Sequence, residues 1–158
     1  PLGGIICTDE VASSMEGKTH FNTYGGNPVS MAGGLAVIEA IEKYKYAENA
    51  QRIGDRLTFG LKRLQDRHPM IGDVRGMGLM LGVELVRDRK TKEPAARETL
   101  RVMEYAKDEG VLLGKGGMAA NTIRVKPPLC VTEEDAETIL SALDKSIGKV
   151  ERESGIVT

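Results

Sequence analysis

A hydroxyl, two adjacent glycines and a helix start stand together in one short run of the sequence, Phe-Asn-Thr-Tyr-Gly-Gly-Asn-Pro. Gly25 and Gly26 allow the backbone to turn sharply and to approach a ligand without a Cβ in the way. Asn27 before Pro28 is typical of an N-cap followed by the first helical position, where N–H groups and the helix dipole favour an anion. Thr23 can add a hydroxyl donor to the same anion oxygens. The run is suited to a phosphate site, but taken alone such a run is more often an ordinary loop before a helix.

Arg124 is the second residue with a plausible role in ligand binding. It lies in a β-prone segment just before Pro127 and Pro128, which end a strand's hydrogen-bond ladder and stiffen the chain after it. A guanidinium fixed in that place can hold a substrate carboxylate through two parallel hydrogen bonds. A strand arginine can also serve only in a salt bridge, so the residue taken alone leaves both roles open.

The other reactive side chains favour no further site. Cys7 and Cys130 are far apart in the sequence and lack the spacing of metal ligands, and neither His20 nor His68 forms a cluster with them. We therefore expect no metal site and no disulfide framework. Gly114–Gly117 contains a Gly-Lys pair but lacks the complete nucleotide-binding loop pattern, and we interpret it as the mobile rim of a site.

The composition of the 158 residues excludes two classes of partner. A net charge of −1 and an aromatic content of 4% leave neither a basic stripe nor a stacking surface, so no nucleic acid is expected. No apolar run approaches the roughly 20 residues that span a bilayer, so no membrane insertion is expected. The hydrophobic content of 41% is sufficient for a core.

Hydrophobic spacing and turn residues predict the elements that position these groups. A buried strand is expected over Leu2–Cys7 and a short helix over Asp9–Met15. A helix begins at Pro28 and continues to Tyr44. Another has apolar residues at helical spacing from Ala50 to Leu64, and Pro69 ends it. We expect this last helix to link two domains.

The rest of the sequence predicts a small sheet with helices. Its segments read, in order, as two strands around a glycine turn, a helix and two further strands: Ile71–Arg75, Leu79–Val86, Glu93–Glu109, Val111–Leu113 and Thr122–Val125. Thr132 is a predicted N-cap of a final amphipathic helix that carries apolar residues as far as Ile147. The predicted fold class is α/β, with a small sheet packed against helices.

Four segments in the same order resemble class III (omega) aminotransferases, which are fold-type I enzymes that use pyridoxal 5′-phosphate. Besides the run that contains Thr23, they are Gly-Asp-Val-Arg-Gly-Met-Gly-Leu-Met-Leu-Gly-Val-Glu at 72–84, Gly-Lys-Gly-Gly at 114–117, and Ile-Arg-Val-Lys-Pro-Pro-Leu at 123–129. The resemblance extends over essentially the whole chain. Within the family it is closest to the branch of alanine–glyoxylate aminotransferase 2, because the Gly-Lys-Gly-Gly and Pro-Pro-Leu-Cys-Val-Thr runs are typical there.

The resemblance implies that the sequence is a C-terminal fragment of a longer enzyme. Residues 1–66 would form the end of the large cofactor-binding domain with its linker helix, and residues 67–158 the small α/β domain. The lysine that forms the Schiff base with the cofactor is expected upstream of Pro1. This chain would then contain no catalytic residue and would be inactive by itself.

The resemblance also assigns roles to three residues. Thr23 matches the threonine that reaches the phosphate of the neighbouring subunit's cofactor, which implies a homodimer. Arg124 matches the arginine that binds the substrate carboxylate, and Asn22 stands where related enzymes can face the substrate. Lys126 departs from the apolar residue common at its place and changes the local charge. Arg75 is a family hallmark that we expect to hold its hairpin in place.

The implied reaction transfers an amino group from alanine, or from a β- or ω-amino acid, to a 2-oxo acid such as glyoxylate or pyruvate. A 4-aminobutyrate- or ornithine-type transaminase, or an aminomutase, would share every quoted motif. A non-catalytic α/β interaction module is the alternative from another class. A targeting peptide would precede this sequence, so only the resemblance bears on the compartment: cytoplasmic in a prokaryote, mitochondrial in a eukaryote.

Overall fold

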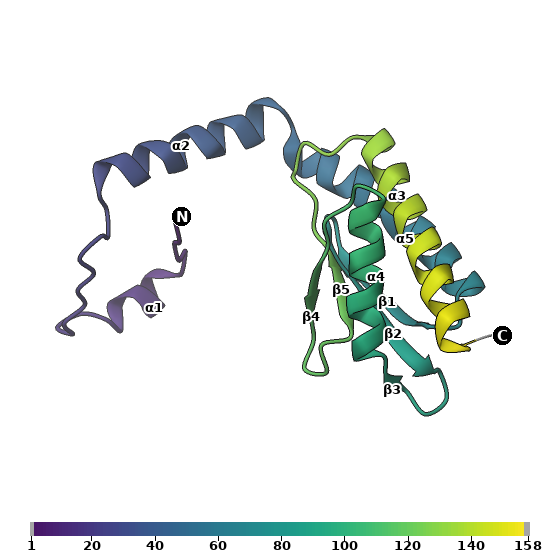
Figure 1. The fold of residues 1–158 in the computed structure, drawn as a ribbon. Coiled ribbons are helices and arrows are strands. Elements are labelled where there is room, and N and C mark those ends of the chain that lie inside the picture. The colour runs from purple at the N-terminus through teal and green to yellow at the C-terminus, as the bar shows by residue number, and fades with distance from the viewer. Residues whose placement is uncertain (1, 157–158) are drawn as a thin grey trace. The chain divides into compact units, whose positions relative to one another are not determined.

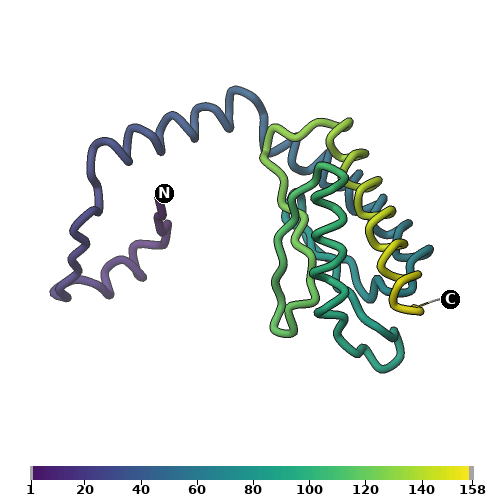
Figure 2. The backbone as a smooth tube through the Cα atoms, viewed as in Figure 1, coloured from purple at the N-terminus to yellow at the C-terminus, as the bar shows by residue number. Residues whose placement is uncertain are grey.

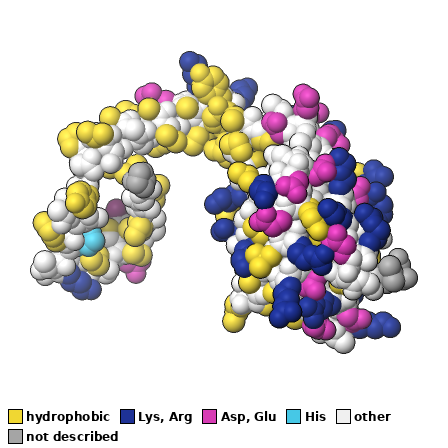
Figure 3. All heavy atoms as spheres, viewed as in Figure 1, with side chains coloured by type: hydrophobic (Ala, Val, Ile, Leu, Met, Phe, Trp, Pro, Cys, Tyr) yellow, Lys and Arg dark blue, Asp and Glu magenta, His cyan; other side chains and the backbone are white. Residues whose placement is uncertain are grey.

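The computed structural model describes residues 2–156, which form two compact units that divide between Lys45 and Tyr46 (Figures 1 and 2). The first unit contains helix α1 (Asp9–Ser13) and helix α2 (Pro28–Lys43), joined by irregular segments. None of its described residues is buried. On the face shown in Figure 3, hydrophobic side chains gather over α2, whereas charged side chains dominate the second unit.

Two predictions for the first unit have opposite outcomes. Helix α1 falls within the predicted range Asp9–Met15 and is confirmed. The predicted buried strand over Leu2–Cys7 is wrong, because this segment has no strand pairing in the described chain and Ile5 and Ile6 are 92% and 103% exposed. The apolar pattern marks a segment suited to burial, but a strand also needs a neighbouring strand to satisfy its backbone groups.

Local sequence determines the start of α2. The Asn27 side chain accepts a hydrogen bond from the Ser30 amide at 2.9 Å, and its NH₂ group donates to the Tyr24 carbonyl at 2.8 Å. Pro28 follows at the first helical position, where a missing N–H costs nothing. The predicted N-cap is therefore confirmed.

The second unit is a small antiparallel sheet with helices. Its elements, in order, are α3 (Tyr46–Arg67), β1 (Ile71–Met77), β2 (Met80–Asp88), β3 (Glu93–Pro94), α4 (Ala96–Asp108), β4 (Gly114–Gly116), β5 (Thr122–Val125) and α5 (Glu133–Ser154). The strand order is β1-β2-β5-β4, and β3 pairs with β2. Helices α3 and α4 contact the sheet, and α5 packs against both helices (Figure 1).

The core lies between the helices and one face of the sheet. Alternation along β2 and β5 sends side chains into it, as with Ile123 and Val125 of β5. Helix α3 supplies an apolar stripe and α5 another, so that the largest fully buried side chains include Ile53, Leu57, Leu61, Val83, Leu85, Ile123, Leu143 and Ile147. On the opposite face of the sheet, Gly82, Glu84 and Arg124 are not buried.

One contact between α3 and the β1–β2 turn is made by backbone. A Cβ on Gly54 of α3 would lie 2.3 Å from the carbonyl oxygen of Gly78, closer than any real contact, and Gly78 itself has a φ of +52°. Only glycine at position 54 allows the helix and the turn to meet at this distance. The turn is thereby fixed against α3.

The strands β1, β2 and β5 and the capped helix α5 confirm their predictions. The Thr132 hydroxyl accepts from the Asp135 amide, and the Asp135 carboxylate accepts from the Thr132 amide, so the cap is reciprocal. Helix α4 begins at Ala96, three residues later than predicted, because the preceding Glu93–Pro94 pairs with β2.

The predicted strand over Val111–Leu113 is wrong, and β4 instead occupies Gly114–Gly116, which we expected to be a mobile rim. Val111–Leu113 has a higher β-propensity than the glycines of Gly114–Gly116. The strand nevertheless forms at Gly114–Gly116, because these residues pair with β5.

Helix α3 packs within the second unit, since its apolar stripe is part of that unit's core. The predicted boundary near residue 66 concerns the two domains of a longer enzyme and stays a prediction. No helix in residues 2–156 is both long and apolar enough to cross a membrane, and the same residues contain no cluster of three or more potential metal ligands.

Candidate functional site

Arg124 lies in the middle of the sheet, on its open face. Its neighbours along β5, Ile123 and Val125, point into the core, so alternation turns the arginine to the opposite side. Across the sheet it faces Gly82 of β2 on one side and Gly114 of β4 on the other. Neither cross-strand neighbour of Arg124 therefore carries a side chain beside the guanidinium.

The Arg124 side chain makes no hydrogen bond or ion pair within residues 2–156. Arg75, on the same sheet, differs: its Nη1 donates to Asp73 and Glu84 at 2.7 Å each. Hydrogen bonds to these two carboxylates raise the pKa of Arg75. Arg75 thus ties β1 to β2, as expected for a residue that holds the hairpin, whereas Arg124 keeps all its donors for an external acceptor.

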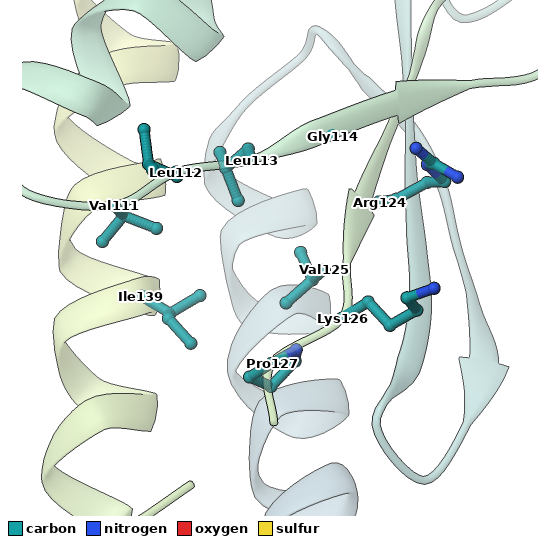
Figure 4. Close-up of a pocket in the computed structure, with 9 residues that line it drawn as sticks. All are labelled: Val111, Leu112, Leu113, Gly114, Arg124, Val125, Lys126, Pro127 and Ile139. Atoms are coloured by element: carbon teal, nitrogen blue, oxygen red, sulfur yellow. The ribbon is translucent and has the colours of Figure 1, made fainter. Parts of the chain in front are cut away.

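A shallow pocket of about 200 Å³ lies beside Arg124. Figure 4 shows Val111, Leu113 and Ile139 on one side of β5, whereas the side chains of Arg124 and Lys126 extend away from them on the other side. Lys126 follows just after β5 ends, and its cation adds to the field of the arginine. Arg124 and Lys126 extend to the same side of β5 (Figure 4), where two neighbouring positive charges are suited to a small organic anion.

Thr23 lies in the first unit, at the start of a tight turn over residues 23–26. The turn depends on Gly26, whose φ of +67° is one that other residues rarely adopt. The Thr23 side chain is exposed and makes no hydrogen bond within residues 2–156. Its hydroxyl is thus available as a donor, next to backbone that has no Cβ at Gly25 or Gly26.

Asn22 has a role within the turn itself. Its Oδ1 accepts from the Tyr24 amide and its backbone carbonyl accepts from the Gly25 amide, both at 3.1 Å. Asn22 also lines a hollow of about 580 Å³ in the first unit, together with Leu2 and Gly25. The prediction that Asn22 faces a substrate stays a prediction.

Thr23 and Asn22 share one turn, whereas Arg124 belongs to the other unit, so each is described within its own unit. The sequence predictions missed the glycine neighbours of Arg124. The available signal was the pair Gly114 and Gly116, which stand at strand spacing before an arginine strand. Nothing in the sequence gave the register that brings them alongside Arg124.

A buried ion cluster around His68 was also missed. His68 Nδ1 lies 2.7 Å from Glu151, and Nε2 lies 2.7 Å from Asp144, both on α5. Burial lowers the pKa of His68, but hydrogen bonds and charge from the two carboxylates outweigh it, so the pKa is raised. With both ring nitrogens bonded to carboxylates, the imidazolium form donates twice. The Met70 amide also donates to Glu151, so the cluster joins α5 to the segment after α3.

Comparison with known proteins adds to this geometry. The family model of class III aminotransferases matches residues 1–147. The chain is 51% identical over 150 residues to the mitochondrial alanine–glyoxylate aminotransferase 2 homolog 2 of Arabidopsis thaliana. This match covers 95% of this chain and 31% of that protein. It is 44% identical over 140 residues to the taurine–pyruvate aminotransferase of Bilophila wadsworthia, covering 85% of this chain and 31% of that protein.

A solved structure agrees with these relatives. An amine transaminase from an uncultivated Pseudomonas species, crystallised in its pyridoxal-phosphate-bound form, superposes with a TM-score of 0.77 at 34% identity, covering 84% of this chain and 30% of that one. The predicted α/β fold of the fold-type I class is confirmed. The chain spans about a third of the length of the curated relatives it matches. Together, these matches show that the chain belongs to the class III aminotransferase family.

Proposed function

We propose that the full-length protein is a pyridoxal-phosphate-dependent aminotransferase. It would move an amino group from alanine, or from a β- or ω-amino acid, to a 2-oxo acid such as glyoxylate or pyruvate. Family membership supports amino-group transfer, and the names of the Arabidopsis and Bilophila relatives support this choice of donors and acceptors.

The unpaired guanidinium of Arg124 is the observation that carries the proposal. A charged group without an internal partner, on an open face and beside a pocket, is suited to an anionic ligand. An α-amino acid and a 2-oxo acid share a carboxylate next to the carbon that exchanges nitrogen for oxygen. When the donor is alanine, one arginine can therefore bind both substrates of the reaction in the same orientation.

The residues of the first unit suit the phosphate of the cofactor. Thr23 offers a free hydroxyl, and the turn through Gly25 and Gly26 leaves room for phosphate oxygens to approach the backbone. When bound, pyridoxal phosphate supplies an electron sink for the bond-breaking steps at the donor carbon. We assign Thr23 to the phosphate held by the partner subunit of a homodimer, so that each site would need two copies of the chain.

The contribution of this chain is binding and orientation. Arg124 holds the substrate carboxylate through paired hydrogen bonds, and Lys126 adds attraction for the anion. Fixing the carboxylate also fixes the direction of the neighbouring amine.

Arg124→Leu in the full-length enzyme tests the proposal. Loss of a charge-assisted contact worth roughly 1.5–3 kcal/mol should lower kcat/KM for carboxylate substrates about 10- to 150-fold. A primary amine donor without a carboxylate should be much less affected, and the cofactor should stay bound. The measurement is single-turnover conversion by each donor. Arg97→Leu, which removes an exposed arginine of α4, is the control.

Equal losses for both donors, or loss of cofactor in Arg124→Leu alone, would show that the arginine supports structure. A panel of amino donors and oxo acids separates the proposed activity from a 4-aminobutyrate- or ornithine-type transaminase and from an aminomutase. A full-length protein that transfers no amino group with any of them would favour the non-catalytic alternative.

A further inference from the structure

The Arg124 side chain lies along β4 on two glycines. A Cβ on Gly114 would stand 3.0 Å from Nη2 and 3.3 Å from Nε of the arginine. A Cβ on Gly116 would stand 3.3 Å from its Cδ. The aliphatic part of the side chain thus crosses Gly116 and the guanidinium rests on Gly114. Contacts this short mean that a methyl group at either position displaces the arginine.

The arrangement is one-sided. Gly82, the neighbour of Arg124 on the opposite strand, also has no side chain. A Cβ on Gly82 would nevertheless meet Thr122 at 3.3 Å, followed by two atoms of Arg75, and no atom of Arg124 is among its three nearest neighbours. The arginine therefore leans toward β4, although both sides lack a Cβ.

Two glycines within a three-residue strand need a physical reason. Glycine in a strand costs conformational entropy and gives up side-chain packing, and it often marks a place where another group approaches closely. Neither Gly114 nor Gly116 has a positive φ, so the backbone does not require glycine at these positions. The atoms nearest to a Cβ at either position all belong to the side chain of Arg124.

We propose that Gly114 and Gly116 are positioning residues that hold the guanidinium of Arg124 flat against β4, and so set where a substrate carboxylate can bind. The inference rests on the proposed function, since it assumes that Arg124 binds a carboxylate. Long side chains lose rotamer freedom when they bind, and a side chain already resting on the sheet loses less. The two glycines thereby determine the depth at which the carboxylate lies above the sheet.

The test uses the full-length holoenzyme with Gly114→Ala, Gly116→Ala and Gly114→Val, beside Gly82→Ala and Arg124→Leu. Two quantities report on the carboxylate contact: KM for L-alanine, and the inhibition constant of propionate, a carboxylate without an amine. Cofactor content and the melting temperature report on the structure. Displacement of a binding group by about 1 Å can cost about 100-fold, so smaller shifts cost less.

We expect each alanine variant to raise both constants about three- to tenfold and Gly114→Val to raise them about 10- to 100-fold, with kcat and cofactor content largely kept. Gly82→Ala should leave both constants unchanged. A structural defect would instead lower cofactor content or melting temperature without a parallel change in propionate inhibition. If Gly114→Val fails to fold, the two alanine variants decide the matter, because they require shifts of only a few tenths of an ångström.

Two results would overturn the inference. One is unchanged constants in the Gly114 and Gly116 variants while Arg124→Leu raises both. The other is an equal rise in Gly82→Ala, which would mean that any methyl group in this row disturbs the sheet. Failure of the proposed function has a different signature, because Arg124→Leu itself would then leave propionate inhibition unchanged.

Discussion

The unit of residues 2–45 exposes apolar side chains of the same kinds that form a core in the unit of residues 46–156. Leu35 of α2 is 59% exposed, whereas Leu57 of α3 is fully buried. The difference lies in their neighbours, because α3 packs on a sheet and another helix while α2 has no such layer within its unit. Apolar residues at helical spacing indicate a surface suited to burial. They stabilise the fold only where other elements pack on that surface and remove it from water.

The same difference separates the two parts of the candidate site. The surroundings of Arg124 are built from its own sheet, so single substitutions in that sheet can test its role. Thr23 lies in a unit in which no described residue is buried, and its proposed role involves the phosphate held by another subunit. Experiments on Thr23 therefore use the full-length protein.

Replacing one leucine by alanine in each unit tests whether only the second unit has a packed core. Leu57→Ala removes fully buried methyl groups and should lower the free energy of unfolding of the 158-residue chain by about 2–5 kcal/mol. Leu35→Ala changes an exposed side chain and should alter it by less than about 0.5 kcal/mol. Urea denaturation measures both values. Equal losses would mean that the first unit has a core of its own.

His68 should give the second unit a pH dependence. The folded-state pKa of His68 lies above its ordinary value of 6.5, so its stabilisation is fully present below that value and is lost as the pH rises through the folded pKa. The free energy of unfolding should therefore fall as the pH is raised above about 6.5.

His68→Gln should remove this pH dependence and lower the free energy of unfolding by about 2–4 kcal/mol at pH 6, because two carboxylates lose their shared cation. Denaturation curves at several pH values measure both effects. The charged groups around the His68 ring are Asp144 and Glu151. Arg67 pairs with Asp144, and Arg89 donates to the His68 backbone carbonyl. His20→Gln, at an exposed position of the first unit, is the control. A pH profile identical in wild type and His68→Gln would contradict the assignment.

Thr23→Val in the full-length dimer tests the other part of the site. Removing one hydrogen bond to a charged phosphate should weaken cofactor binding by roughly 1.5–3 kcal/mol. In heterodimers with one mutant subunit, the cofactor should leave the site of the unmutated partner. Thr19→Val, at another exposed position of the same unit, is the matched control. Loss from the mutant subunit's own site would refute the assignment across the interface.

The smallest effect is expected from the 158-residue chain by itself. Incubation with pyridoxal phosphate followed by borohydride reduction should label no single lysine stoichiometrically, because none of its lysines stands at the family position. Peptide mass mapping of the reduced product provides the measurement. One saturable labelled lysine would contradict the prediction that the Schiff-base lysine lies upstream of Pro1.

Features that depend on near neighbours in the chain could be predicted from the sequence. The Asn27 cap and the reciprocal Thr132–Asp135 cap each join residues three apart, and both are observed. The strand over Leu2–Cys7 failed because its existence depends on a pairing partner. β4 was misplaced because the register opposite Arg124 outweighs the β-propensity of Val111–Leu113.

For the candidate site, too, the sequence indicated some residues and missed others. Resemblance to the family singled out Arg124 and Thr23, and their roles stay predictions. The glycines that support Arg124 and the carboxylates that surround His68 were missed. His68 and Glu151 are 83 residues apart, and no spacing rule along the chain connects residues at that separation.

The glycine contact between α3 and the β1–β2 turn also decides where the chain can carry a tag or an inserted peptide. The turn at Gly78 is closed to insertion, because the Gly78 backbone rests directly on Gly54 and an added loop would separate helix from sheet. The turn after β2 is open to it. There the Asp88 side chain accepts from the amides of Lys90 and Thr91, all three residues are exposed, and an insertion between the last two would disturb only that local turn.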